Sequence, residues 1–106
     1  MMINEQVLAE IVKRLTTNFQ PYQIILFGSQ ARQTADARSD VDILVICPIK
    51  GNRRALMVSM DISLEGLGIA RDIVILSPEE FEIDRQIPGT VARTAWKEGR
   101  VLYERS

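Results

Sequence analysis

The chain has 106 residues, a length that corresponds to one domain with a single hydrophobic core. Apolar residues make up 46% of it and charged residues 25%, as in ordinary globular proteins, and the net charge of −1 gives no indication of a nucleic-acid surface built on bulk positive charge. The chain has no histidine and one cysteine, Cys47, so disulfides, His/Cys zinc sites and catalytic groups that need histidine are excluded.

Apolar periodicity and turn residues predict four strands and four longer helices around a small sheet, an α/β or α+β domain. The first half of the chain is predicted to form a helix capped by Asn4 and reaching residue 18, a strand over 23–27, an irregular polar segment with one helical turn over 30–39, and a strand over 41–46. A helix over 51–66 and a strand over 72–76 follow. The last part is predicted to form a helix starting at Ser77-Pro78-Glu79-Glu80, a helix over 90–98 and a strand over 101–103.

Three details of this pattern can be compared with a structure. The run at 41–46 is almost continuously apolar, which is typical of a central strand covered on both faces. Gly99 is predicted to end the last helix as a left-handed cap. Trp96, on the same helix, is predicted to belong to the core, with a place at an interface as the alternative.

Paired carboxylates are the first candidate site. Asp40 and Asp42 are two residues apart, so in an extended chain their side chains leave the same face, where they repel unless a cation lies between them. Asp72 begins a later strand and joins the pair if that strand lies beside residues 41–46. Oxygen ligands favour Mg²⁺ or Mn²⁺, and three carboxylates could hold two Mg²⁺ ions about 4 Å apart, as in-line phosphoryl displacement requires. Asp72, nearest the acceptor, could also act as general base.

A glycine-containing turn is the second candidate site. Gly28 follows the strand over 23–27 and lets the backbone approach a phosphate, whose oxygens the Ser29 hydroxyl and nearby N–H groups can bind. Arg32, one helical turn further on, can meet a phosphate or pair with a carboxylate. Each feature alone also fits a simpler interpretation. The glycine turn can be a plain turn, and the paired aspartates can lie at a solvated strand edge or in a turn. Asp72 can be a surface residue or form an ion pair with Arg71. Their conjunction favours the metal and phosphate site.

The residues Gly28-Ser29-Gln30-Ala31-Arg32 and Ser39-Asp40-Val41-Asp42 resemble the signature of the DNA polymerase β-type nucleotidyltransferase superfamily. The small size is similar to its minimal nucleotidyltransferase (MNT) branch. The resemblance covers nearly the whole chain, read as one minimal domain over residues 1–106. It includes the third-aspartate strand at 71–74 and a Gly-x-x-Leu-Tyr ending at 99–103.

This resemblance implies a nucleotidyltransferase fold, a small mixed sheet flanked by helices, with Mg²⁺-dependent use of a nucleoside triphosphate such as ATP. It implies carboxylate roles for Asp40, Asp42 and Asp72. Proteins of this branch are often antitoxins of a HEPN-domain ribonuclease toxin, and some transfer AMP from ATP to a tyrosine of that toxin. Gln33 departs from the family pattern, which commonly has glycine after the Ala-Arg pair.

Three functions remain open at this point. The first is an adenylyltransferase acting on a partner protein, which fits the small size because no second domain is available to grip an acceptor. The second is a non-catalytic antitoxin that neutralises the toxin by occupying it. The third is a small-molecule nucleotidyltransferase. The first residues lack the pattern of a signal peptide and no apolar run approaches about 20 residues, so we expect a cytoplasmic protein without membrane contact or stable nucleic-acid binding.

Overall fold

Helices and strands alternate along the chain as the apolar pattern predicts. The computed structural model describes residues 3–32 and 40–105. The elements, in order, are α1 (Glu5–Phe19), β1 (Gln23–Phe27), α2 (Ser29–Arg32), β2 (Val41–Ile46), α3 (Arg53–Ser63), β3 (Arg71–Leu76), α4 (Pro78–Asp84), α5 (Val91–Glu98) and β4 (Arg100–Glu104).

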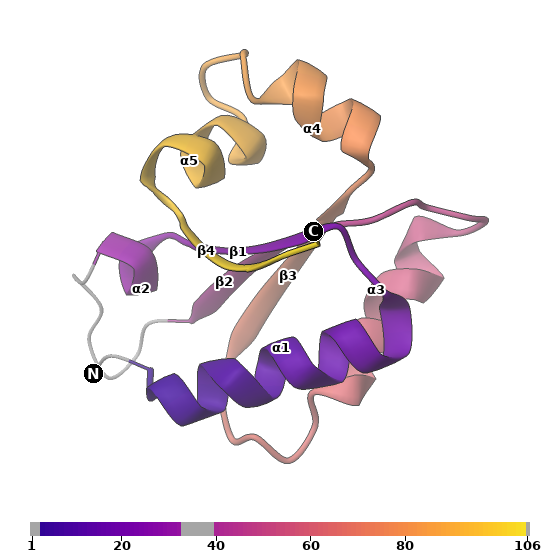
Figure 1. The fold of residues 1–106 in the computed structure, drawn as a ribbon, viewed down its shortest axis with the longest axis vertical. Helices are drawn as coiled ribbons and strands as arrows, with labels where there is room; N and C mark the ends of the chain where they lie inside the picture. The colour runs from indigo at the N-terminus through magenta and orange to yellow at the C-terminus, as the bar shows by residue number, and fades with distance from the viewer. Residues whose placement is uncertain (1–2, 33–39, 106) are drawn as a thin grey trace.

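Within these ranges the strands form one mixed sheet in the order β3-β2-β1-β4. Strand β1 pairs antiparallel with both β2 and β4, and β2 pairs parallel with β3. Helices α1 and α3 cover one face of the sheet, α4 and α5 cover the other, and the short α2 lies at one end (Figure 1). The predicted small mixed sheet flanked by helices is confirmed. None of the described helices is long and apolar enough to cross a membrane.

Strand β2 is the centre of the core, with side chains buried on both faces. Ile43 and Val45 belong to the cluster that α1 and α3 cover, whereas Leu44 and Ile46 belong to the cluster that α4 and α5 cover. This alternation is the period of two that an extended chain imposes. The prediction of a central strand covered on both faces is confirmed.

Most helix ends follow their sequence signals. Asn4 caps α1 through a hydrogen bond from the Gln6 amide, and Ser77 and Glu80 form the reciprocal capping box that starts α4. The left-handed cap predicted at Gly99 is wrong, because this residue is extended with φ −79° and ψ 167°. A Cβ built there would lie 2.3 Å from the Ala95 carbonyl oxygen. Close packing, not a positive φ, is what this position requires of glycine.

The prediction that Trp96 is a core residue is also wrong. Its side chain is 48% exposed, and the guanidinium carbon of Arg85 lies 4.7 Å from the centre of its ring, a cation–π contact. The sheet-facing side of α5 is formed by Ala92 and Ala95 instead. Small side chains on that side bring α5 close to the sheet, and the large indole is left on the outer side.

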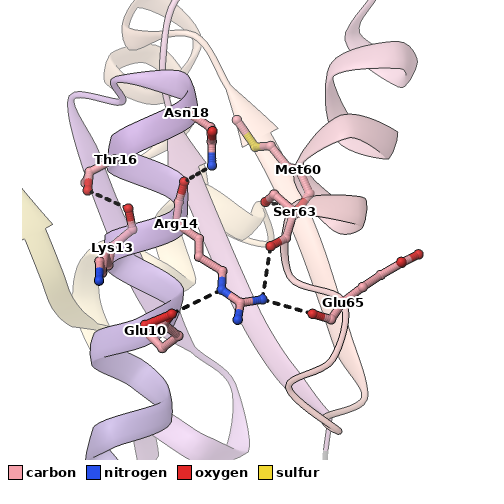
Figure 2. A network of polar contacts seen from close by, with 8 residues as sticks. All are labelled: Glu10, Lys13, Arg14, Thr16, Asn18, Met60, Ser63 and Glu65. Atoms are coloured by element: carbon pink, nitrogen blue, oxygen red, sulfur yellow. Dashed lines mark hydrogen bonds and ion pairs between the residues drawn. The ribbon is translucent and has the colours of Figure 1, made fainter.

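Arg14 joins the two helices on the other face of the sheet (Figure 2). Its Nη1 donates hydrogen bonds to the carbonyl oxygens of Ser63 at 3.3 Å and Glu65 at 2.9 Å, and its Nε donates to Glu10 at 3.3 Å. The last carbonyls of a helix have no intrahelical donor, so Arg14 of α1 supplies the missing one to the end of α3. This contact fixes how α3 lies beside α1.

Removing a side chain from the middle of β2 tests this description of the core. We expect Leu44→Ala to lower the free energy of unfolding by about 2–5 kcal/mol, because the leucine is fully buried and its loss leaves a cavity. Urea unfolding is the measurement. Val101→Ala is the control, since Val101 is 49% exposed and its truncation should change the free energy by no more than about 0.5 kcal/mol. Equal effects of the two substitutions would contradict the description.

Candidate active site

Three adjacent strands bring Gly28, Asp42 and Asp72 to one end of the sheet. Asp42 of β2 lies opposite Phe27 of β1, the residue before Gly28, and opposite Asp72 of β3. Residues opposite one another on neighbouring strands project from the same face. Because Leu44 follows Asp42 with the same alternation, that face is the one covered by α4 and α5. The condition for Asp72 to join the pair, that its strand lies beside residues 41–46, is therefore met.

Gly28 approaches Asp42 more closely than any other residue type could. Its φ is +73°, and a Cβ built on it would lie 2.3 Å from Oδ2 of Asp42. Directly after this turn α2 begins at Ser29, and the Arg32 amide donates to the Gly28 carbonyl at 3.1 Å. The Asp42 carboxylate therefore occupies the place that a side chain at position 28 would need.

The pKa of the Asp42 carboxyl reflects the charged groups around it. Burial raises the pKa of the Asp42 carboxyl above its ordinary value, and the negative charges of Asp72 and Asp40 raise the pKa further. The positive charge of Arg32 opposes this rise. Arg32 itself is exposed, with Nη1 4.0 Å from Oε2 of Glu98 on α5. The carboxyl groups of Asp40 and Asp72 are thus close enough to Asp42 for their repulsion to be felt.

The chemistry of these side chains fits a divalent cation, although their present positions do not enclose one. Across residues 3–32 and 40–105, no three His, Cys, Asp or Glu side chains converge as a ready-made metal site. The available ligands are carboxylate oxygens, which suit Mg²⁺, and a cation beside Asp42 would offset the repulsion that raises its pKa. Coordination by Asp40, Asp42 and Asp72 stays a prediction.

Of the two simpler interpretations of Asp72, the ion pair with Arg71 is wrong, whereas the exposed position fits a surface residue. Arg71 pairs with Asp61 of α3, with Nε 2.9 Å from Oδ1, and also donates to the Asp61 carbonyl. Asp72 is exposed and has no ion-pair partner in the part of the chain that the structure describes. Its carboxylate is therefore available to a ligand.

Gln30 is a residue of the site region that sequence reasoning did not single out. It is 4% exposed, and its Oε1 accepts a hydrogen bond from the Ile3 amide at 2.9 Å, which ties the segment before α1 to α2. A polar residue between Ser29 and Ala31 carries no signal of burial in the sequence alone. Two other positions of the motif region, Gln33 and Ser39, lie outside the described residues.

A family model described as the nucleotidyltransferase domain matches residues 8–103. The chain belongs to the nucleotidyltransferase domain family. The match includes the glycine turn and all three aspartates, so the residues at this end of the sheet are part of the family's domain. No curated protein matches the chain significantly.

Solved structures share the fold of this nucleotidyltransferase domain. A putative nucleotidyltransferase from Sulfolobus solfataricus has a TM-score of 0.67 and 24% identity, over 94% of this chain and 79% of that one. A chain of a toxin–antitoxin complex with AMP-PNP has a TM-score of 0.68 and 24% identity, over 98% and 76%. A chain of a complex of the tri-AMPylated Shewanella oneidensis HEPN toxin with MNT antitoxin has a TM-score of 0.63 and 20% identity, over 97% and 74%.

Substitution of Gly28 tests its close approach to Asp42. We expect Gly28→Ala to lower the free energy of unfolding by about 1–3 kcal/mol, through the left-handed φ and the contact with Oδ2, and to slow nucleotidyl transfer at least about tenfold by displacing the carboxylate. Gly66→Ala is the matched control, since Gly66 has φ +90° but nothing within 4 Å of a built Cβ. If Gly28→Ala kept full activity, as Gly66→Ala should, the position of the Asp42 carboxylate would not depend on the turn at Gly28.

The raised pKa of Asp42 gives a pH prediction. A carboxyl whose pKa is higher in the folded than in the unfolded state binds its proton more tightly when the protein is folded. Above the pKa of the folded state, the charged group therefore destabilises the fold. Below the pKa of the unfolded state, about 3.9, the group is protonated in both states and no longer destabilises it. We therefore expect Asp42→Asn to be more stable than the wild type at pH 7, with the difference shrinking as the pH falls. Urea unfolding across pH measures this difference in stability.

In a carboxyl NMR titration, Asp72→Asn should lower the pKa of Asp42, and an unchanged pKa would contradict the proximity of the two groups.

Proposed function

We propose that the protein is a Mg²⁺-dependent nucleotidyltransferase that transfers AMP from ATP to a tyrosine hydroxyl of a HEPN-type toxin and thereby acts as its antitoxin. The observation that carries this proposal is the alignment of Asp42 on β2 with Asp72 on β3 and with Phe27, the last residue of β1, which Gly28 follows. Membership of the family supports the reaction class. The fold shared with chains of toxin–antitoxin complexes, one with AMP-PNP and one with an AMPylated HEPN toxin, supports the nucleotide and the partner.

The proposed reaction is an in-line displacement at the α-phosphorus of ATP. The acceptor oxygen forms a bond to this phosphorus while the bond to the oxygen bridging the α- and β-phosphates breaks, and pyrophosphate leaves. Asp72 takes the proton of the acceptor hydroxyl as general base. Gly28 and Ser29 hold the triphosphate by backbone and hydroxyl groups, and Arg32 contributes positive charge.

Asp40, Asp42 and Asp72 are the residues that would hold Mg²⁺. Bound there, the cation would neutralise charge on the phosphates and lower the pKa of the attacking hydroxyl. The carboxylates contribute the oxygen ligands and the local negative charge that favour a divalent cation over a monovalent one. Asp42, the most buried of the three, is the residue held most firmly by the sheet.

Labelled ATP tests the proposal directly. With Mg²⁺ and a purified HEPN-type toxin from the same source, the wild type should transfer label from [α-³²P]ATP to the toxin and EDTA should stop it. Asp42→Asn should reduce the rate at least about a hundredfold, because removing one charged group from such a site commonly costs that much. Glu79→Gln on the exposed start of α4 is the control and should keep the wild-type rate. No transfer by the wild type would overturn the proposal.

A non-catalytic antitoxin is the second candidate. The observation that favours it is the lack of a ready-made three-ligand metal site among the described residues. In this case the protein neutralises the toxin by covering it. Asp42→Asn would then still protect cells that express the toxin, whereas loss of protection with an intact complex would exclude occlusion as the mechanism.

A further inference from the structure

A buried amide side chain lies between two residues of the proposed nucleotide site. Of the residues that the structure describes, Gln30 is the only polar one that is buried, with 4% of its surface exposed. Its Oε1 accepts a hydrogen bond from the backbone amide of Ile3 at 2.9 Å, across 27 positions in the chain. Burying an amide costs free energy that a leucine of similar size would not. An amide differs from leucine in that its hydrogen bond also fixes the direction in which the side chain points.

Helix α2, which carries Gln30, is too short to hold its own orientation. It is a single turn that follows β1 (Figure 1), and the backbone hydrogen bond described for it runs from the Arg32 amide to the Gly28 carbonyl at 3.1 Å. Isolated helices shorter than about 12–15 residues are marginal in water. The orientation of α2 therefore depends on its contacts with the rest of the domain.

Two polar contacts join α2 to distant elements in the part of the chain that the structure describes. Nη1 of Arg32 lies 4.0 Å from Oε2 of Glu98, but both side chains are about half exposed, and exposed ion pairs contribute little. The hydrogen bond between Ile3 and Gln30 is shorter and involves a buried side chain. It also ends on a firm anchor, because the Ile3 side chain packs against the core and the next residue, Asn4, caps α1. This bond is therefore the contact that fixes α2.

The position of Gln30 determines where Arg32 points. Successive residues of an α-helix are rotated by about 100°, so Arg32 projects about 200° away from Gln30, from the opposite side of α2. Burial follows this geometry, since Gln30 is buried and Arg32 is exposed. Ser29 lies three positions before Arg32 and so shares its side of the helix. A rotation of α2 that exposed Gln30 would turn both residues away from the Asp42 carboxylate.

We propose that Gln30 is a positioning residue for the nucleotide. Its hydrogen bond from Ile3 holds α2 in the rotation that directs Ser29 and Arg32 toward the triphosphate, so Gln30 acts through α2 without touching the nucleotide. The inference rests on the proposed function for the place of the triphosphate beside α2. It adds a coupling between the segment before α1 and the nucleotide. Because such coupling is reciprocal, a bond that strengthens nucleotide binding is strengthened by the nucleotide by the same factor.

Matched variants test the role of Gln30. Gln30→Met keeps the length of the side chain and removes the acceptor. We expect the Kd for AMP-PNP with Mg²⁺ and the KM for ATP to rise about tenfold, as for loss of one buried hydrogen bond, while kcat at saturating ATP and the KM for the toxin stay within about twofold. Ser77→Ala is the control, because it removes a 3.1 Å hydrogen bond from the Glu80 amide at the opposite end of β3 from Asp72. It should destabilise the fold without changing the Kd or either KM. Equal Kd values for the wild type and Gln30→Met would overturn the inference.

Amide hydrogen exchange tests the coupling in the wild type, without any transfer reaction. Saturating AMP-PNP with Mg²⁺ should slow exchange of the Ile3 amide about tenfold, the factor by which Gln30→Met weakens binding. The Tyr22 amide, which donates to the Ile46 carbonyl at the other end of the sheet, is the control and should keep its rate. An unchanged Ile3 rate would overturn the inference even if Gln30→Met does not fold.

The same measurement separates failure of this inference from failure of the proposed function. If the wild type transfers no label to the toxin while AMP-PNP still slows exchange at Ile3, the proposed transfer is wrong and the role of Gln30 in nucleotide binding stands. If the wild type transfers AMP while the Ile3 rate stays unchanged, the positioning role is wrong and the activity stands.

Discussion

Burial of β2 on both faces is the constraint on which the site depends. Ile43 and Val45 are held by α1 and α3, and Leu44 and Ile46 by α4 and α5, so a shift of one residue in register would exchange the two sets. Such a shift would also turn Asp42 to the opposite face, away from Asp72. The hydrophobic core therefore fixes the position of a charged residue at its edge. The register of β2 therefore determines both the packing of the core and the position of Asp42 in the candidate site.

The site keeps like charges together at a cost to stability. Asp42 is partly buried beside two further carboxylates, and the one described cation that lowers its pKa, Arg32, is itself close to Glu98. An ordinary surface would pair these charges, as Arg71 pairs with Asp61 and Arg53 with Glu80. Among the described residues, the paired charges along α3 thus contrast with the carboxylates near the starts of β2 and β3, whose mutual repulsion a divalent cation would offset.

The sequence predicted local features well and long-range packing less well. The strands at Gln23–Phe27 and Val41–Ile46 were predicted because period and turn residues are local properties. The pairing of β2 with β3 was posed only as a condition, because the partner of a strand is not a local property. Trp96 and Gly99 were misjudged because their environment depends on how closely α5 approaches β1. Burial of Gln30 and the pairing of Arg71 with Asp61 likewise depend on segments distant in the chain, which no local pattern encodes.

The two sides of the candidate site differ in the chemistry they offer. Toward β1 the chain presents a glycine turn, backbone groups of α2 and Arg32, all suited to phosphate. Toward β3 it presents the exposed side chain of Asp72, while the guanidinium groups of Arg53 and Arg71 are engaged by Glu80 and Asp61. Those ion pairs keep the cations near β3 from competing for a triphosphate. Backbone donors and positive charge thus lie on one side of Asp42 and a carboxylate on the other, so a phosphate group would be drawn toward β1 and away from Asp72.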